Sequence, residues 1–316
     1  MRTLLFSFLF ALLASGFLAQ AEEPKARQDA PQTFLYKSIG TYKLSLDVFR
    51  PPDTQLRPVI FWIHGGALIS GERRWLPPQQ RQRYVAARFV VVSIDYRLAP
   101  ETKLEGILED LKDAHAWVVK NGEKLFSADA SRLAVVGNSA GGYLTLMSGF
   151  VLQPRPKALV SFYGYGDIAG PWYSKPDEFY RTKPLVTEQD ALASLQKGWR
   201  GRFYLYCRQN GLWPKEVSGY DPEKEPAKFE RYCPERNVDA AYPPTLLLHG
   251  DQDTDVPVSL SRSMDAALTR QKVEHELIIM KGMGHSFDTG PRGLEQPEVK
   301  AVFNHALEFL TSKLKP

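Results

Sequence analysis

Ser139 lies in the pentapeptide Gly137-Asn138-Ser139-Ala140-Gly141, a G-x-S-x-G pattern whose central hydroxyl could act as a nucleophile. The apolar run 133–136 precedes it, and residues suited to a helix follow it at 142–147. A strand, a tight turn and a helix in this order would push the serine hydroxyl out at the end of a sheet, where a base can reach it. Glycines flank the serine because strand and helix approach too closely there for side chains. The pattern indicates nucleophilic catalysis by Ser139.

A serine nucleophile needs a base, and His285 is the best placed histidine. It lies in the glycine-rich segment 281–287, directly after the last apolar run of strand length. Loops that follow the carboxyl ends of parallel strands are where open α/β sheets carry their chemistry. We therefore predict that His285 is the general base. The other histidines occupy predicted helix, strand or turn positions: His64, His115, His249, His275 and His305.

The acid that orients the base is predicted in the segment 249–257, which follows the penultimate apolar run. Asp253 is the first choice, ahead of Asp255 and then Asp251, which we assign to capping backbone amides within the turn. The D-x-D-x-D spacing also resembles a calcium loop. An EF-hand would need glycine at the sixth position and glutamate at the twelfth, where this chain has Val256 and Arg262. No metal and no cofactor is expected.

An oxyanion hole needs backbone N–H groups near the nucleophile. The segment His64-Gly65-Gly66-Ala67 follows an early apolar run, and its glycines would let backbone amides approach a substrate oxygen. We predict that the amides of Gly66 and Ala67 act together with the amide of Ala140.

Apolar runs of strand length alternate with amphipathic helical patterns along most of the chain. Near-continuous apolar strands between helices indicate an α/β fold with a doubly wound, mostly parallel sheet covered on both faces. Residues 41–49 alternate in polarity and suit an antiparallel entry strand. The expected buried strands are 58–63, 89–94, 133–136, 158–162, 245–248 and 277–280, and the expected helices lie around 80–88, 104–120, 140–150, 258–271 and 298–313.

The stretch 171–236 interrupts this alternation and is predicted to be an inserted cap. It has no long apolar strand but many aromatic residues, among them Trp172, Tyr173 and Trp213. Both cysteines of the chain, Cys207 and Cys233, lie in it. In an exported protein we expect them to form a disulfide, and two buried thiols are the alternative.

Residues 1–21 resemble a secretory signal peptide, with a basic start, an apolar stretch and a cleavage site at Ala19-Gln20-Ala21. A membrane anchor is the weaker interpretation, because polar and small residues interrupt the short apolar run. The expected organisation is therefore a signal peptide over 1–21, a catalytic domain over 22–170 and 237–316, and the cap between them. A secreted or periplasmic location follows. The formal net charge of +4 is too small to indicate nucleic-acid binding.

Taken together, these motifs resemble the α/β-hydrolase esterases of the hormone-sensitive-lipase and bacterial feruloyl/acetyl-esterase-like branches. The similar segments are the oxyanion motif at 64–67, D-Y-R-L-A-P-E at 95–101, the G-x-S-A-G-G nucleophile elbow at 137–142, the acid loop at 249–257 and the histidine loop at 284–287. The chain departs from the lipase-like members by carrying two glycines where they carry three. Its insertion follows the strand that ends near Phe162, which argues against a lipase-type substrate.

The resemblance implies a serine esterase that uses Ser139, His285 and Asp253 to cleave a small-molecule or carbohydrate ester. Trp75 and Tyr165 are expected near the site. Asp95 and Arg97 are expected to form a structural ion pair, and no nucleic acid or stable membrane anchor is expected as a partner. A prolyl-oligopeptidase-like peptidase is the alternative within hydrolases. A non-catalytic binding protein of the same fold is the alternative from another class.

Overall fold

An eight-stranded sheet runs through the part of the chain that the computed structural model describes, which is residues 30–198, 200–290 and 292–316. The strand order is β1-β2-β4-β3-β5-β6-β7-β8, in which β3 to β8 are parallel and β2 is antiparallel to both of its neighbours. The bounds are β1 Gln32–Ile39, β2 Tyr42–Phe49, β3 Arg57–Ile63, β4 Val90–Ile94, β5 Ala128–Asn138, β6 Ala158–Phe162, β7 Thr245–Gly250 and β8 His275–Met280.

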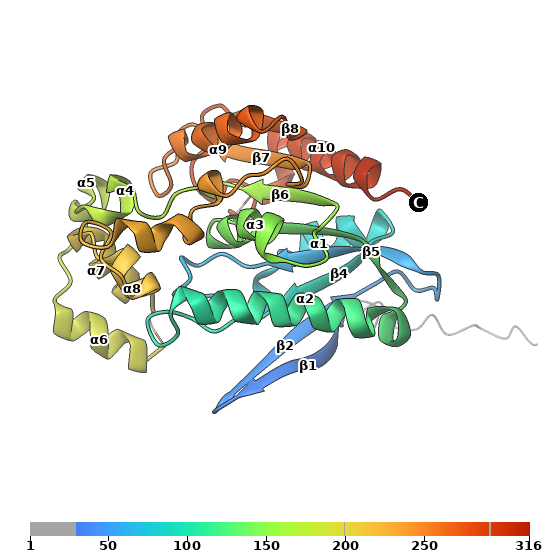
Figure 1. Cartoon of the computed structure of the whole chain (residues 1–316), viewed down its shortest axis with the longest axis horizontal. Coiled ribbons are helices and arrows are strands. Elements are labelled where there is room, and N and C mark those ends of the chain that lie inside the picture. Colours follow the sequence, from blue (N-terminus) through green and yellow to red (C-terminus); the bar gives the residue numbers. More distant parts are fainter. Residues whose placement is uncertain (1–29, 199, 291) are drawn as a thin grey trace, which may run out of the picture. The chain divides into compact units, whose positions relative to one another are not determined.

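Helices cover both faces of this sheet (Figure 1). The side chains of β3 show how, because successive residues of a strand point to opposite faces. Val59, Phe61 and Ile63 join one buried cluster, and Ile60 and Trp62 join the other. The first cluster packs under α2 Leu104–Phe126, α3 Ala140–Val151 and α9 Ser259–Arg270, and the second under α1 Pro78–Ala86 and α10 Pro297–Lys313.

The structure confirms the doubly wound, mostly parallel α/β fold, and each expected strand and helix is present within a few residues. Strand β1 was not anticipated. It is an edge strand whose residues are mostly exposed or half-buried, so its sequence lacks the apolar continuity of the central strands. The predicted signal peptide at 1–21 lies outside the described residues. Among the described residues, no helix is both long and apolar enough to cross a membrane.

The stretch 171–236 folds as a series of short helices between β6 and β7, and α4 to α8 gather at one end of the sheet (Figure 1). Phe203, Trp213 and Tyr232 of this stretch belong to the same buried cluster as α2 and α3. The insertion is therefore packed onto the catalytic domain. Its helices are α4 Pro171–Ser174, α5 Glu178–Arg181, α6 Glu188–Gln196, α7 Arg200–Asn210, α8 Trp213–Ser218, η3 Pro226–Tyr232 and η4 Pro234–Arg236.

Two expected pairings are wrong. Cys207 and Cys233 are separate, buried thiols rather than a disulfide, and each fills the apolar core as a small hydrophobic residue. Sγ of Cys233 lies 3.2 Å from a carboxylate oxygen of Asp167.

Asp95 and Arg97 do not form the expected ion pair with each other. Asp95 pairs with Arg73 at 2.5 Å, and Arg97 pairs with the buried Asp110 of α2 at 2.7 Å. Alternate positions of an extended segment face the same side, but here each residue pairs with a partner from another element, Asp95 with Arg73 and Arg97 with Asp110.

Candidate active site

Ser139 lies on a strained turn between β5 and α3, with φ of 53° and ψ of −120°. Its amide donates to the carbonyl of Phe162, which fixes the turn against β6. The flanking glycines are required by close approach. A Cβ at Gly137 would lie 2.4 Å from the carbonyl oxygen of Gly141, and a Cβ at Gly141 would lie 2.1 Å from the carbonyl oxygen of Ile63. The turn thus has the geometry that the G-x-S-x-G pattern predicts.

His285 lies between Ser139 and a buried carboxylate. Its Nε2 is 3.0 Å from Oγ of Ser139, and its Nδ1 is 2.7 Å from Oδ2 of Asp253. Because Nδ1 faces a carboxylate, it carries the proton, and Nε2 is left to accept one from the serine. The other carboxylate oxygen of Asp253 accepts from the backbone amides of Asp255 and Val256. Three segments far apart in the sequence therefore meet in one chain of hydrogen bonds.

The charges around His285 favour its protonated form. Burial by itself would lower the pKa of His285, but the hydrogen bond to Asp253 and the charges of Asp255 and Asp253 outweigh it and raise that pKa. Burial would raise the pKa of Asp253, yet its hydrogen bonds with His249 and His285 hold that pKa well below the usual range. Asp253 is therefore ionised and ready to stabilise an imidazolium cation.

A buried polar network packs against the imidazole ring of His285 through Tyr163. The ring of Tyr163 lies edge-on to His285 with centroids 4.6 Å apart. The Tyr163 hydroxyl donates to Asp288 at 2.5 Å and accepts from the side chain of Asn138, and Gln80 donates to the second oxygen of Asp288. The burial of Asp288 raises its pKa. Sequence reasoning missed Tyr163 and Asp288, although their positions just after β6 and three residues after His285 were a usable signal.

Two of the three predicted oxyanion residues line the same cleft, and the third directly follows Ser139. Gly66 and Ala67 border the cleft, and Ala140 is the first residue of α3, where backbone amides have no partner within the helix. Within the described part of the chain, the amides of Gly66, Ala67 and Ala140 donate to no other protein group. Ala67 has a positive φ of 56°, and its carbonyl accepts from the indole Nε1 of Trp213 at 2.9 Å.

Two histidines near the site have structural roles. His64 is buried and stacked on Tyr96 with ring centroids 4.1 Å apart, and burial lowers its pKa to about 4, so it is neutral. Its Nδ1 lies 2.7 Å from the carbonyl oxygen of Gly65. His249 lies between Ser261 and the carbonyl of Val256. Neither ring reaches the nucleophile, as the sequence indicated.

The other two aspartates of the acid loop do not pair with Nδ1 of His285. Asp251 accepts from the backbone amide of Gly282, so it ties the acid loop to the histidine loop rather than capping an amide of its own turn, as was expected. Asp255 extends toward the insertion, where its Oδ1 accepts from the hydroxyls of Tyr180 and Tyr204 and from Arg208. These insertion residues were not anticipated, since nothing in the sequence linked α7 to the acid loop.

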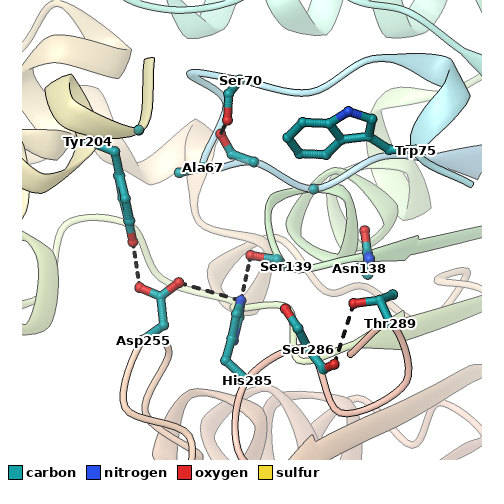
Figure 2. Close-up of a pocket in the computed structure, with 13 residues that line it drawn as sticks. Ala67, Ser70, Trp75, Asn138, Ser139, Tyr204, Asp255, His285, Ser286 and Thr289 are labelled. Atoms are coloured by element: carbon teal, nitrogen blue, oxygen red, sulfur yellow. Dashed lines mark hydrogen bonds and ion pairs between the residues drawn. The ribbon is translucent and has the colours of Figure 1, made fainter. Parts of the chain in front are cut away.

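A cleft of about 500 Å³ opens above Ser139. Trp75 forms part of its wall with half of its side chain exposed, and Asp255 and Tyr204 lie across the serine from it (Figure 2). Tyr165, which was expected near the site, is fully buried against Tyr143 instead. The cleft is lined by Gly65, Gly66, Ala67, Ser70, Trp75, Asn138, Ser139, Gly201, Tyr204, Asp255, His285, Ser286 and Thr289.

This fold and site place the chain in a known family. Residues 60–289 match the model of the Abhydrolase_3 family, described as an alpha/beta hydrolase fold. The protein therefore belongs to the α/β-hydrolase superfamily as a member of this family.

Solved structures agree with this fold. The chain is similar to the propionate-bound esterase Est2 of Thermogutta terrifontis, with 20% identity, a TM-score of 0.67 and coverage of 90% of this chain and 95% of that one. It is also similar to an alpha/beta hydrolase superfamily protein of Enterococcus faecalis, with 21% identity, a TM-score of 0.71 and coverage of 90% and 99%. At this identity the likeness shows the fold.

A curated relative is the non-reducing polyketide synthase mapC' of Penicillium brevicompactum, 28% identical over 90% of this chain. The chain spans 16% of that relative's length.

Proposed function

We propose that this protein is a serine hydrolase that cleaves carboxylic esters through an acyl-enzyme. The observation that carries the proposal is the continuous hydrogen-bond chain from Asp253 through His285 to Ser139, at the floor of an open cleft. Nucleophile, base and orienting acid occur in the order and geometry that acyl transfer requires.

The first half of the reaction forms the acyl-enzyme. His285 Nε2 takes the proton of Ser139 as Oγ attacks the ester carbonyl carbon, and Asp253 stabilises the imidazolium that results. The carbonyl oxygen becomes an oxyanion, which the amides of Gly66, Ala67 and Ala140 would bind. When the tetrahedral intermediate collapses, the carbon–oxygen bond to the alcohol breaks, and the Nε2 proton passes to the departing oxygen.

The second half repeats the same steps with water. Water enters the cleft, gives a proton to His285 Nε2 and attacks the acyl carbon. The intermediate collapses with release of the acid, and the proton returns to Ser139. Apart from the ester and one water molecule, both halves use only groups of the chain.

The comparisons support an ester as the substrate. The family comprises α/β-hydrolases, and a similar solved structure is named an esterase and was determined with propionate. The curated relatives are polyketide synthases of which this chain matches a minor part, so they supply no substrate for it. The exposed Trp75 beside the nucleophile suits a flat aromatic or carbohydrate group on the ester.

The test combines covalent labelling with turnover. A fluorophosphonate probe should label the wild-type protein and fail to label Ser139→Ala, and 4-nitrophenyl acetate and butyrate should be hydrolysed by the wild type alone. A panel of acetylated xylan and feruloyl sugars then ranks natural esters. Equal labelling of both proteins, or no turnover of any ester by folded wild type, would contradict the proposal.

We also propose that the protein is exported, with cleavage after Ala21. The support is the sequence pattern of residues 1–21, whose basic start, apolar stretch and A-x-A site are typical of signal peptides. Expression of the full chain followed by fractionation and N-terminal sequencing should give a mature protein that begins at Glu22. An intact Met1 start in the cytoplasmic fraction would contradict it.

A further inference from the structure

Asp255 presents to the cleft a carboxylate oxygen, Oδ2, that accepts no hydrogen bond from the described residues. Its Oδ1 accepts from Tyr180, Tyr204 and Arg208, all in the insertion. Its Oδ2 receives no hydrogen bond within the described residues. The nearest printed partner of Oδ2 is Nε2 of His285, 3.5 Å away, and in the resting site that nitrogen is itself an acceptor for Ser139. Oδ2 therefore has free capacity to accept from a molecule in the cleft.

The charge of Asp255 is only partly balanced. Arg208 is buried, and it is shared between Asp255 at 2.7 Å and Asp177 at 2.5 Å. One guanidinium thus faces two carboxylates, which leaves the cluster with an excess negative charge. Among the described residues that line the cleft, Asp255 is the only acidic side chain and none is a lysine or arginine. The cleft wall beside His285 is therefore anionic.

We propose that Asp255 is a specificity-determining residue, which selects esters that bring a hydrogen-bond donor or a cation next to the reacting group and rejects esters that bring a carboxylate. A substrate hydroxyl or ammonium would donate to Oδ2 across the cleft from Trp75 (Figure 2). A substrate carboxylate would meet a like charge without compensation, which is a standard device of specificity. The proposal rests on the proposed ester hydrolysis and adds the substrate class to it.

The insertion is what fixes the orientation of this carboxylate. Three donors from α5 and α7 hold Oδ1, so the side chain cannot rotate to turn both oxygens toward solvent. The exposed fraction of the Asp255 side chain is 19%, which is consistent with one covered oxygen and one open oxygen. The selectivity would therefore come from a residue of the acid loop that the insertion positions.

The test compares matched pairs of esters within one protein. On the acyl side, the 4-nitrophenyl monoester of succinic acid is compared with 4-nitrophenyl 4-methylpentanoate. On the alcohol side, acetylcholine is compared with 3,3-dimethylbutyl acetate. Each pair differs in charge at nearly equal shape. The ratio of kcat/KM within a pair cancels any change in the pKa of His285 that a substitution causes.

Asp255→Asn should shift the charged-to-neutral ratio of at least one pair by about fivefold or more, in favour of the anion or against the cation. This scale corresponds to one unscreened charge within several ångströms of the ligand at a protein surface. Asp177→Asn is the matched control, because it removes the other carboxylate of Arg208 but does not line the cleft. It should leave both ratios within about twofold of wild type.

The outcomes separate the two proposals. Unchanged ratios in Asp255→Asn, or equal shifts in both variants, overturn the role of Asp255 while ester hydrolysis stands. If folded wild-type protein leaves both neutral esters intact, ester hydrolysis itself falls and the selectivity falls with it. The pair that responds identifies the side of the ester that Asp255 faces.

Discussion

Arg208 is the residue through which the insertion is expected to be held onto the acid loop, and Arg208→Met tests this. The side chain is 1% exposed and pairs with Asp177 and Asp255. Its guanidinium also lies over the rings of Tyr173 and Tyr180, at 4.7 and 4.5 Å from their centroids. Methionine keeps much of the volume but removes the cation, so two carboxylates lose their shared partner.

Breaking a buried ion pair from one side costs about 3–5 kcal/mol. Because both carboxylates are 19% exposed and can regain some water, the lower end applies, about 3 kcal/mol. For a chain of this size that corresponds to a fall in Tm of roughly 6 °C. Differential scanning calorimetry measures the shift, and limited proteolysis of α6 and α7 should become faster well below the Tm.

Arg202→Met is the matched control on the same helix. Its side chain is 49% exposed and pairs at 3.3 Å with Asp190, which is 52% exposed, so the pair contributes at most about 1 kcal/mol. Equal Tm shifts in the two variants, or no change in proteolysis for Arg208→Met, would refute the reasoning that this cluster holds the insertion.

Three further predictions concern the site itself. Ser139→Ala and His285→Ala should each lower turnover by ~10⁴ or more, and the double variant should be hardly worse because the two residues act as a unit. Losses in the free energy of activation that add up in the double variant, measured by steady-state kinetics, would contradict this. The acid limb of kcat/KM should follow deprotonation of His285 and be displaced upward from the ordinary histidine pKa, since the pKa of His285 is raised. Asp253→Asn should lower the rate by orders of magnitude and move that limb to lower pH, and a limb that stays fixed would speak against His285 as the base. Trp213→Phe removes the hydrogen bond to the carbonyl of Ala67 and should therefore misalign the predicted oxyanion donor at Ala67. We expect kcat to fall about tenfold with little change in KM. A change confined to KM would indicate a role in substrate packing instead.

Much of the fold could be predicted from the sequence because its central strands are buried on both faces. The runs at β3, β4, β6 and β7 are mostly apolar and buried, as a parallel sheet covered on both faces requires. Strand β1 was not predicted, because an exposed edge strand needs no continuous apolar run. The glycines of the nucleophile turn were informative for a related reason, since the backbone contacts at Gly137 and Gly141 leave no room for a Cβ.

The candidate triad could also be located from sequence, because each member follows a recognisable strand and lies in a short loop. The sequence could not predict which side chains pair with residues of other helices, strands or loops. Asp95 pairs with Arg73 and Arg97 pairs with Asp110, although their closeness in the motif suggested that Asp95 and Arg97 pair with each other. Cys207 and Cys233 lie in the same segment but remain separate thiols. Pairings of this kind depend on tertiary distances that no local pattern encodes.

The insertion contacts both walls of the cleft, and this links its sequence to substrate choice. On one wall, Trp213 holds the carbonyl of Ala67, and Arg200 donates to the carbonyls of Ile69 and Ala99. On the other wall, Tyr204 and Arg208 hold Asp255.

The reacting atoms of Ser139 and His285, by contrast, are fixed by the sheet loops and by Asp253. Changes in α7 should therefore alter which esters are accepted more than the chemistry that cleaves them, whereas Trp213 of α8 is expected to act on kcat through the carbonyl of Ala67. We therefore expect the sheet motifs to determine the proposed reaction, and residues 171–236 with the acid-loop carboxylate that they orient to determine the substrate.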